Sequence, residues 1–207
     1  MMGIIHRADL AARFTLTEAA VIVGLPRKRV RRYVDDGTVP VRVRSPGLRF
    51  GAREVFVLLL RARIRTLKLP KSDWKDLAEL VLHRRESSGR WSREREHLAF
   101  MSATDERFEV DFVRIRADAA RRALRYWRGK RRIVRDPLIL GGEPVFRGTR
   151  IPVAHVAALL RKGSRPEEIL EDFPSLNRDD LGAAGSHAEV GPPPGRPRRL
   201  VLLRTAV

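Results

Sequence analysis

The sequence contains no cysteine. A disulfide framework, a thiolate zinc site and a cysteine nucleophile are therefore all excluded. Long hydrophobic runs are also missing, because stretches such as Val55–Leu60 are far too short to span a bilayer and are followed at once by arginine. The first residues, Met1–Arg7, lack the basic region and long apolar stretch of a signal peptide. These absences predict a cytoplasmic protein that does not enter the membrane.

Motifs of enzymatic chemistry are missing as well. The chain has no Gly-x-Ser-x-Gly, P-loop or dinucleotide glycine fingerprint, and the Gly141-Gly142 pair is too isolated to form a phosphate loop. The five histidines show no metal-binding spacing. A metal-dependent nuclease would need several convergent carboxylates, whereas most acids here lie at predicted helix N-termini or beside arginines. We therefore expect no enzymatic activity, no metal and no cofactor.

Positive charge is the main feature that is present. The chain has 43 Lys and Arg against 25 Asp and Glu, and its formal net charge is +18. Residues 1–67 hold 14 basic and 5 acidic side chains, which is half of that excess. Such a field favours a polyanionic partner, because contacts to phosphates release condensed counterions. The alternative is a generally arginine-rich composition without a specific partner.

Two short helices are predicted near the N-terminus. The first follows Phe14, with Thr15 as N-cap and Glu18 closing a capping box, and it ends at Gly24. The second, Arg27–Asp36, places its apolar residues on one face and its basic residues largely on the other. Those basic residues are Arg27, Lys28, Arg31 and Arg32. Two short helices around a tight glycine turn, with a basic second helix, are typical of a helix-turn-helix with a recognition helix.

A basic β-hairpin is predicted next. Val39–Arg44 alternates apolar and basic residues, Ser45–Gly47 forms a turn, and Leu48–Phe50 begins the return strand. A helix over Ala52–Leu67 follows, with Val55, Leu58, Leu59 and Ala62 on its core face. The hairpin arginines available to DNA are Arg42, Arg44 and Arg49.

The order of these elements over residues 14–67 resembles the winged helix-turn-helix of the MerR/excisionase type. The alternative is a small helical module whose arginines only solvate a surface. No sustained heptad repeat follows, so we do not expect an effector-sensing MerR regulator.

Residues 68–131 predict a small α+β segment. The expected elements are a helix from Ser72 to about Arg85, a break at Ser87–Gly89, strands His97–Met101 and Phe108–Ile115, and a helix from about Asp118 to Arg128. Leu124 and Trp127 are expected on the inner side of that last helix. Because the strands offer free edges and the helix offers Trp127, residues 97–128 are the expected interface of a homodimer.

From residue 132 the pattern changes to a strand, a turn and a short extended arm held by glycine and proline. The run contains Asp136-Pro137, Gly141-Gly142-Glu143-Pro144-Val145 and Gly148-Thr149-Arg150-Ile151-Pro152-Val153. A helix over Ala154–Arg161 and another from Pro166 are predicted to follow, with Asn177 capping a third.

This run, with Pro-Glu-Glu-Ile-Leu-Glu-Asp and Pro-Ser-Leu after it, resembles over residues 132–181 a small domain long described only as of unknown function. That domain is common in VapB-like antitoxins encoded beside PIN-domain ribonuclease toxins, and the longer members also begin with a helix-turn-helix. The resemblance implies an antitoxin that binds and silences its toxin, while the pair represses its own operon by binding double-stranded DNA.

The arm is the segment expected to contact the toxin, because an arginine could neutralise the clustered carboxylates that hold metal in such ribonucleases. The candidate toxin-binding residues are Arg147, Thr149, Arg150 and Ile151. The alternative is that the arm only braces the small C-terminal domain.

The chain departs from this family near its end. Leu181–His187 is interrupted by glycine and lacks a large apolar face, so the third helix is not expected to be completed. Gly191–Pro197 is rich in proline and glycine.

The expected fold class is α+β, mainly α. It comprises a winged helix-turn-helix (1–67), an α+β middle segment (68–131), a small helical domain of helix-turn-helix type with a short β arm (132–181), and a disordered or divergent tail (182–207). The expected function is that of an antitoxin and autorepressor. The alternative is a stand-alone winged-helix regulator or an excisionase-like DNA-binding factor.

Overall fold

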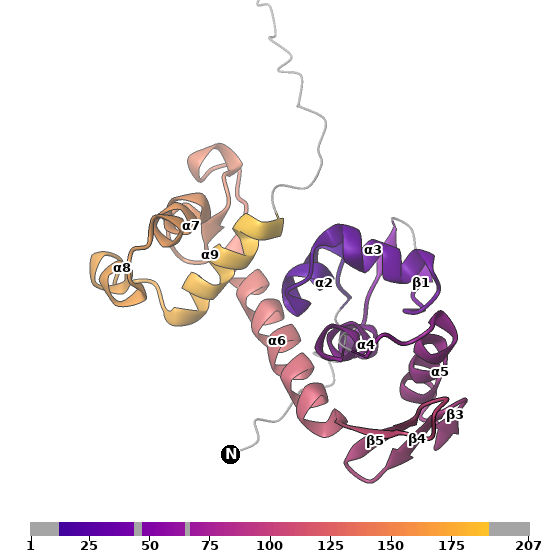
Figure 1. Cartoon of the computed structure of the whole chain (residues 1–207). Helices are drawn as coiled ribbons and strands as arrows, with labels where there is room; N and C mark the ends of the chain where they lie inside the picture. The colour runs from indigo at the N-terminus through magenta and orange to yellow at the C-terminus, as the bar shows by residue number, and fades with distance from the viewer. Residues whose placement is uncertain (1–12, 44–46, 65–66, 191–207) are drawn as a thin grey trace, which may run out of the picture.

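Helices predominate in the computed structural model, which describes residues 13–43, 47–64 and 67–190 (Figure 1). The longer helices are α2 (Leu16–Val23), α3 (Arg27–Asp35), α4 (Ala52–Arg63), α5 (Lys71–Leu82), α6 (Phe112–Arg132), α7 (Val153–Lys162), α8 (Pro166–Asp172) and α9 (Arg178–Val190). The strands are β1 (Arg42–Val43), β2 (Leu48–Arg49), β3 (Ser87–Ser88), β4 (Trp91–Glu94), β5 (His97–Met101), β6 (Arg107–Asp111), β7 (Ile133–Val134) and β8 (Val145–Phe146). The predicted class, α+β and mainly α with small antiparallel sheets, is confirmed.

The first two helices begin and end as predicted. The Thr15 hydroxyl accepts from the Glu18 N–H, and the Glu18 carboxylate accepts from the Thr15 N–H, which closes the capping box. Gly24 ends α2 with φ +69°, a conformation that costs little only for glycine. Val30 of α3 is fully buried in the hydrophobic core, and α3 packs against α2. This packing leaves the opposite side of α3 to solvent.

The hairpin after α3 is shorter than predicted. β1 and β2 pair in antiparallel register, with Arg42 opposite Arg49 and Val43 opposite Leu48. Phe50 then forms an antiparallel bridge with Phe14, which ties the end of the hairpin to the start of the fold.

Two helix ends in the next region differ from the prediction. α4 ends at Arg63 rather than Leu67, and Ala62 on its predicted core face is only half-buried. The following helix was expected from Ser72, but α5 begins one residue earlier, at Lys71, with Pro70 at the N-cap position. The reason is that the Pro70 carbonyl already accepts the first helical hydrogen bond, from the Trp74 N–H at 3.3 Å.

The middle segment is a four-stranded antiparallel sheet in the order β3-β4-β5-β6. The sequence did not predict β4, although its Trp91 is almost fully buried and donates its indole N–H to the Asp73 carbonyl at 3.0 Å. The helix α5 does not continue through Ser87–Gly89, as expected, and Ser87 and Ser88 form the short strand β3.

The longest helix, α6, begins earlier than predicted. The expected strand to Ile115 was wrong, because the Asp111 side chain accepts from the Arg114 N–H at 2.9 Å and caps a helix that starts at Phe112. α6 runs between the N-terminal elements and α7–α9 (Figure 1). Trp127 is half-buried and packs against the core that the N-terminal and middle elements share, so less of its surface is available to a second subunit than expected. Leu124 is half-buried.

The C-terminal elements have a hydrophobic core of their own, formed around Phe146, Val156 and Ile169. The prediction that the third helix is not completed was wrong, since α9 runs through Gly182 and Gly185 to Val190. A small residue suffices at Ala183, because this position of α9 lies against Gly129 of α6. Residues 191–207, the rest of the expected tail, lie outside the described residues.

Within the described part of the chain, none of the helices combines the length and the apolar character needed to cross a membrane.

Candidate functional site

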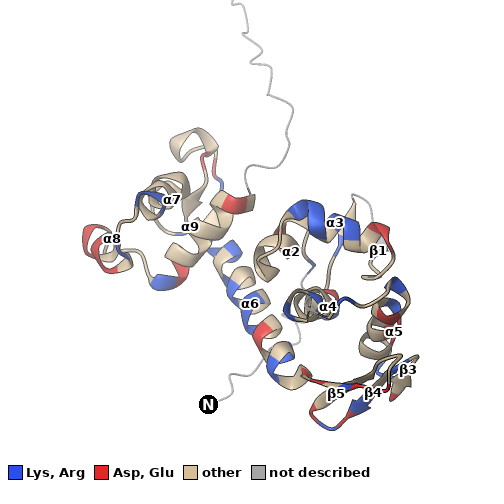
Figure 2. Ribbon diagram, in the orientation of Figure 1, with Lys and Arg blue, Asp and Glu red and all other residues tan. Residues whose placement is uncertain are grey.

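The exposed side of α3 is strongly basic (Figure 2). Its exposed cations are Arg27, Lys28, Arg29, Arg31 and Arg32. Arg31 pairs with Asp35 one turn later, at 2.9 Å between Nε and Oδ1. Within residues 13–43, 47–64 and 67–190 the other four make no ion pair. Their charge is therefore available to an external anion. Arg29 was missed by the sequence reasoning, although the helical spacing alone could have included it.

A shallow groove runs beside this face of α3. Besides the α3 side chains it is lined by Leu16 at the start of α2 and by Lys71 at the start of α5. The sequence could not identify Lys71, because its approach to α3 depends on how α5 packs. The groove extends the basic surface beyond one helix.

The C-terminal end of α3 is held by Arg61 of α4. The Arg61 guanidinium lies 3.7 Å from the ring centre of Tyr33 and 4.8 Å from that of Trp74, and its Nη2 is 3.7 Å from Oδ2 of Asp36. Burial lowers the pKa of Arg61, partly offset by Asp36. The side chain stays charged, since an arginine pKa starts far above 7. Contacts on its inner side thus fix α3, and the four unpaired cations on its outer side take no part in holding it in place.

The predicted arginines of the hairpin are only partly placed. Arg42 lies in β1 opposite Arg49, but its side chain is not described, and Arg44 lies outside the described residues. Arg49 is half-buried, and its Nη1 donates to the Leu48 carbonyl at 3.4 Å.

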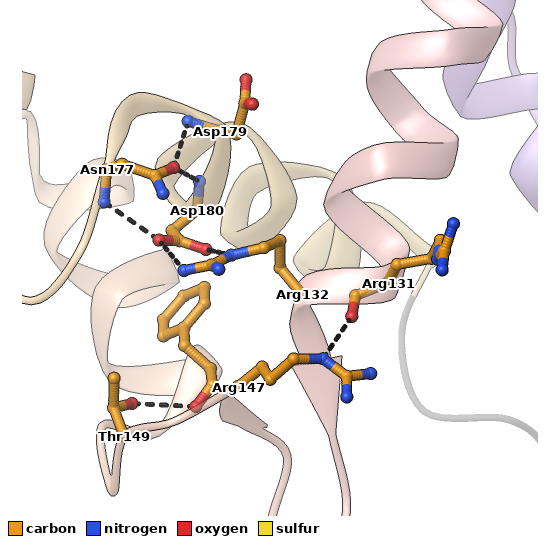
Figure 3. Close-up of polar contacts among 8 residues, drawn as sticks. Arg131, Arg132, Arg147, Thr149, Asn177, Asp179 and Asp180 are labelled. Carbon is orange, nitrogen blue, oxygen red and sulfur yellow. Dashed lines mark hydrogen bonds and ion pairs between the residues drawn. The ribbon is translucent and has the colours of Figure 1, made fainter.

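The predicted toxin-binding arm is a tight hairpin turn rather than an extended segment (Figure 3). The Phe146 carbonyl accepts from both the N–H and the hydroxyl of Thr149, each at 3.0 Å. The Thr149 hydroxyl oxygen in turn accepts from the Ile151 N–H at 3.1 Å. Gly148, with φ +79°, takes the left-handed position that this turn requires. The Phe146 N–H also donates to the Ile151 carbonyl across the turn, at 3.2 Å. This bond closes the segment that was expected to be extended.

Of the four predicted arm residues, three make contacts within the fold and one, Arg150, does not. Arg147 is tied to the end of α6, with its N–H 2.6 Å from the Arg132 carbonyl and its Nε 3.1 Å from the Arg131 carbonyl. Thr149 closes the turn, and Ile151 packs against the C-terminal core. Arg150 is exposed and has no hydrogen bond or ion pair to any residue of the described ranges.

A second exposed feature lies at the other end of the β7–β8 pair. The connecting loop presents Leu138, 88% exposed, and Leu140, 53% exposed. Leu140 also has φ +49°, which a branched aliphatic side chain rarely adopts. Leu138 and Leu140 are the two most exposed large hydrophobic side chains of the described residues.

Across residues 13–43, 47–64 and 67–190, no group of three or more His, Asp or Glu side chains is placed to hold a metal ion.

Parts of this chain are similar to known proteins. Residues 133–188 match the family described as "Protein of unknown function (DUF433)". A protein of Sinorhizobium fredii, "Uncharacterized protein y4eO", is 46% identical over 66 residues, which are 32% of this chain and 30% of that protein. The match thus spans less than a third of the relative's length. The crystal structure of Rv2018 from Mycobacterium tuberculosis is similar at 18% identity and a TM-score of 0.34, over 84% of this chain and 97% of that one.

Proposed function

We propose that this chain is a DNA-binding antitoxin that represses its own operon and neutralises a PIN-domain ribonuclease. The observation that supports DNA binding is the row of exposed, unpaired cations on α3, namely Arg27, Lys28, Arg29 and Arg32. α3 has the width to enter a major groove, and its charges would release counterions from the phosphates. A helix used only for packing would not need four unpaired cations on its solvent side.

The DNA half of the proposal is tested by fluorescence anisotropy with a duplex from the chain's own upstream region. The variant Lys28→Ala/Arg32→Ala should bind more weakly, by roughly 1–3 kcal/mol for each side chain that reads a base. If both contact phosphates instead, the slope of log K against log salt should fall by about two units. Arg114→Ala/Lys162→Ala removes two exposed cations elsewhere and is the matched control. Equal affinities and slopes for the two variants would refute this role of α3.

The toxin half rests on the resemblance of residues 132–181 to VapB-like antitoxins, a segment that coincides with the matched residues 133–188. Two structural features support it. Leu138 and Leu140 offer an exposed apolar contact, and Arg150 offers an unpaired guanidinium that could enter a carboxylate pocket. Arg147 and Thr149 instead serve the hairpin itself.

Co-expression with the ribonuclease encoded beside this gene tests the toxin half. Leu138→Ser/Arg150→Ala should lose growth rescue and co-purification while remaining folded by circular dichroism. Met101→Ser/Arg95→Ala changes one exposed apolar and one exposed basic residue on the middle sheet, and should keep both. If the first variant rescues as well as the control, toxin binding is not located here. The stand-alone regulator then remains, provided that DNA binding holds.

We also propose a homodimer, because one helix-turn-helix contacts few base pairs and operators are often two-fold symmetric. The edge strand β6 (Arg107–Asp111) supports an interface within residues 97–128.

A further inference from the structure

A cleft lies where α2, α6 and α9 meet, on the side of the molecule between the basic helix and the C-terminal domain. Its volume is about 720 Å³, which is in the range of small-molecule sites in proteins. The cleft is bounded by segments that are far apart in the sequence. The cleft therefore depends on the tertiary fold, and no motif in the sequence indicates it.

The wall of the cleft holds three arginines that the fold does not use. Arg27 from α3, Arg125 from α6 and Arg135 after β7 all line it, and all three are exposed. Among the residues that the structure places, none of them has an ion-pair partner. By contrast, the Lys130 Nζ in the same wall lies 2.6 Å from Oε1 of Glu18, so that charge is neutralised. The lining thus keeps three cations, Arg27, Arg125 and Arg135, that no carboxylate of the described residues neutralises.

The apolar part of the lining, which we call the floor, consists of aliphatic and small residues. Val21, Ile22 and Ile133 contribute aliphatic side chains, and Gly182 and Ala183 of α9 contribute small ones. Gly182 is exposed and a Cβ on it would meet no heavy atom within 4 Å, so a larger side chain fits at this position. His187 also lines the cleft. Burial, and to a lesser extent Arg135, lowers the pKa of His187, so its ring is neutral at pH 7 and offers hydrogen bonds rather than charge.

We propose that this cleft binds a small organic anion, whose carboxylate or phosphate lies on Arg125 and Arg135 and whose apolar body lies on the floor. Cations without partners and an apolar surface in the same cleft are the two features that such an amphipathic anion requires. Because Arg27 belongs both to the cleft and to α3, a bound anion would draw this side chain away from DNA. That coupling rests on the proposed DNA binding, whereas the site itself does not.

Fluorescence titration of the full chain with 8-anilinonaphthalene-1-sulfonate tests the site without DNA. The probe should bind to the folded protein, and octanoate and octyl phosphate should displace it. Their relative potencies then decide between a carboxylate and a phosphate source. Inorganic phosphate should displace it poorly, because it lacks an apolar body. Absence of probe binding, or equal displacement by inorganic phosphate, would overturn the proposal.

Two variants locate the site. Arg125→Gln/Arg135→Gln should weaken probe binding at least about tenfold, while Arg114→Gln/Arg128→Gln, which removes two exposed cations outside the cleft, should not. Gly182→Leu keeps the charge of the cleft and adds a large side chain to its floor, so it too should weaken probe binding. An unchanged near-UV circular dichroism spectrum would show that the variant is folded. Equal affinity of the cleft and control variants would place the probe elsewhere and refute the site. A ligand that binds yet leaves DNA affinity unchanged would refute only the coupling.

Discussion

The guanidinium of Arg132 grips the carboxylate of Asp180 at both oxygens, with Nε–Oδ1 at 2.7 Å and Nη2–Oδ2 at 2.9 Å (Figure 3). Asp180 is fully buried, and its Oδ2 also accepts from the Asn177 N–H at 2.9 Å. The side-chain oxygen of Asn177 in turn accepts from the N–H groups of Asp179 and Asp180. The hydrogen bonds to Asp180 raise the pKa of Arg132. One buried carboxylate thus caps α9 and joins it to the end of α6.

Asp180→Ala should lower the free energy of unfolding by about 3 kcal/mol, because it removes one partner of a buried ion pair together with a helix cap. Urea unfolding followed by circular dichroism measures the change. Asp179→Ala, at the exposed neighbouring position, is the control and should cost far less. Similar costs for the two variants would show that the ion pair contributes little.

A second buried acid, Glu18, joins α2 to α6 and predicts a pH dependence. Burial raises the pKa of Glu18, but the Lys130 ammonium and the Thr15 N–H lower it more, so it lies below the usual 4.5. Since the folded pKa is the lower one, the stabilisation is present above about pH 4.5 and is lost as the pH falls through the folded value. Glu18→Gln should therefore be less stable than the parent at pH 7, and the difference should shrink below pH 4.5. Urea unfolding at both pH values measures it. Glu171→Gln at an exposed site controls for net charge, and an equally large pH effect there would contradict the assignment.

Asp35 provides a test in which DNA binding is expected to improve. Its carboxylate pairs with Arg31 on the outer side of α3 and would face the phosphates of a bound duplex. Asp35→Asn should free Arg31 and remove a repulsion, which strengthens binding several-fold at low salt and less at high salt. Anisotropy titrations at two salt concentrations measure this. Asp172→Asn on α8 makes the same charge change at an exposed remote site. If Asp172→Asn strengthens binding as much, or Asp35→Asn weakens it, the outer face of α3 does not meet DNA.

Local signals were sufficient for the N-terminal helices. The Thr15–Glu18 capping box and Gly24 act within a few residues, so their effect can be read directly from the chain. Elements fixed by distant contacts were less predictable. Trp91 makes β4 a core strand only because Asp73 and the neighbouring strands surround it. No residue close to Trp91 in the sequence indicates that it is buried.

The candidate sites also combine residues that local sequence patterns predict with residues that only the packing of distant elements brings together. The exposed cations of α3 follow from helical periodicity, apart from Arg29, whereas Lys71 joins their groove only through the packing of α5. The arm was expected to be extended because glycine and proline were read as stiffening the chain. The hydrogen bonds of Thr149 to Phe146 and Ile151 show that they instead permit a closed turn.

The glycines of α6 and α9 illustrate how packing decides what a residue contributes, and they predict opposite effects. At Gly129 an added Cβ would lie 3.1 Å from Cβ and 3.3 Å from Cα of Ala183, so the two helices touch through this position. Gly129→Leu should therefore force α9 away from α6 and destabilise the fold by more than about 2 kcal/mol. At Gly185, also within α9, a Cβ would meet nothing within 4 Å, and the backbone does not have a positive φ. Gly185→Ala should stabilise the protein by up to about 1 kcal/mol through helix propensity alone. Urea unfolding of both variants tests the pair. A destabilised Gly185→Ala would mean that α9 is not a continuous helix there, and a tolerated Gly129→Leu would mean that α6 and α9 are not in close contact in solution.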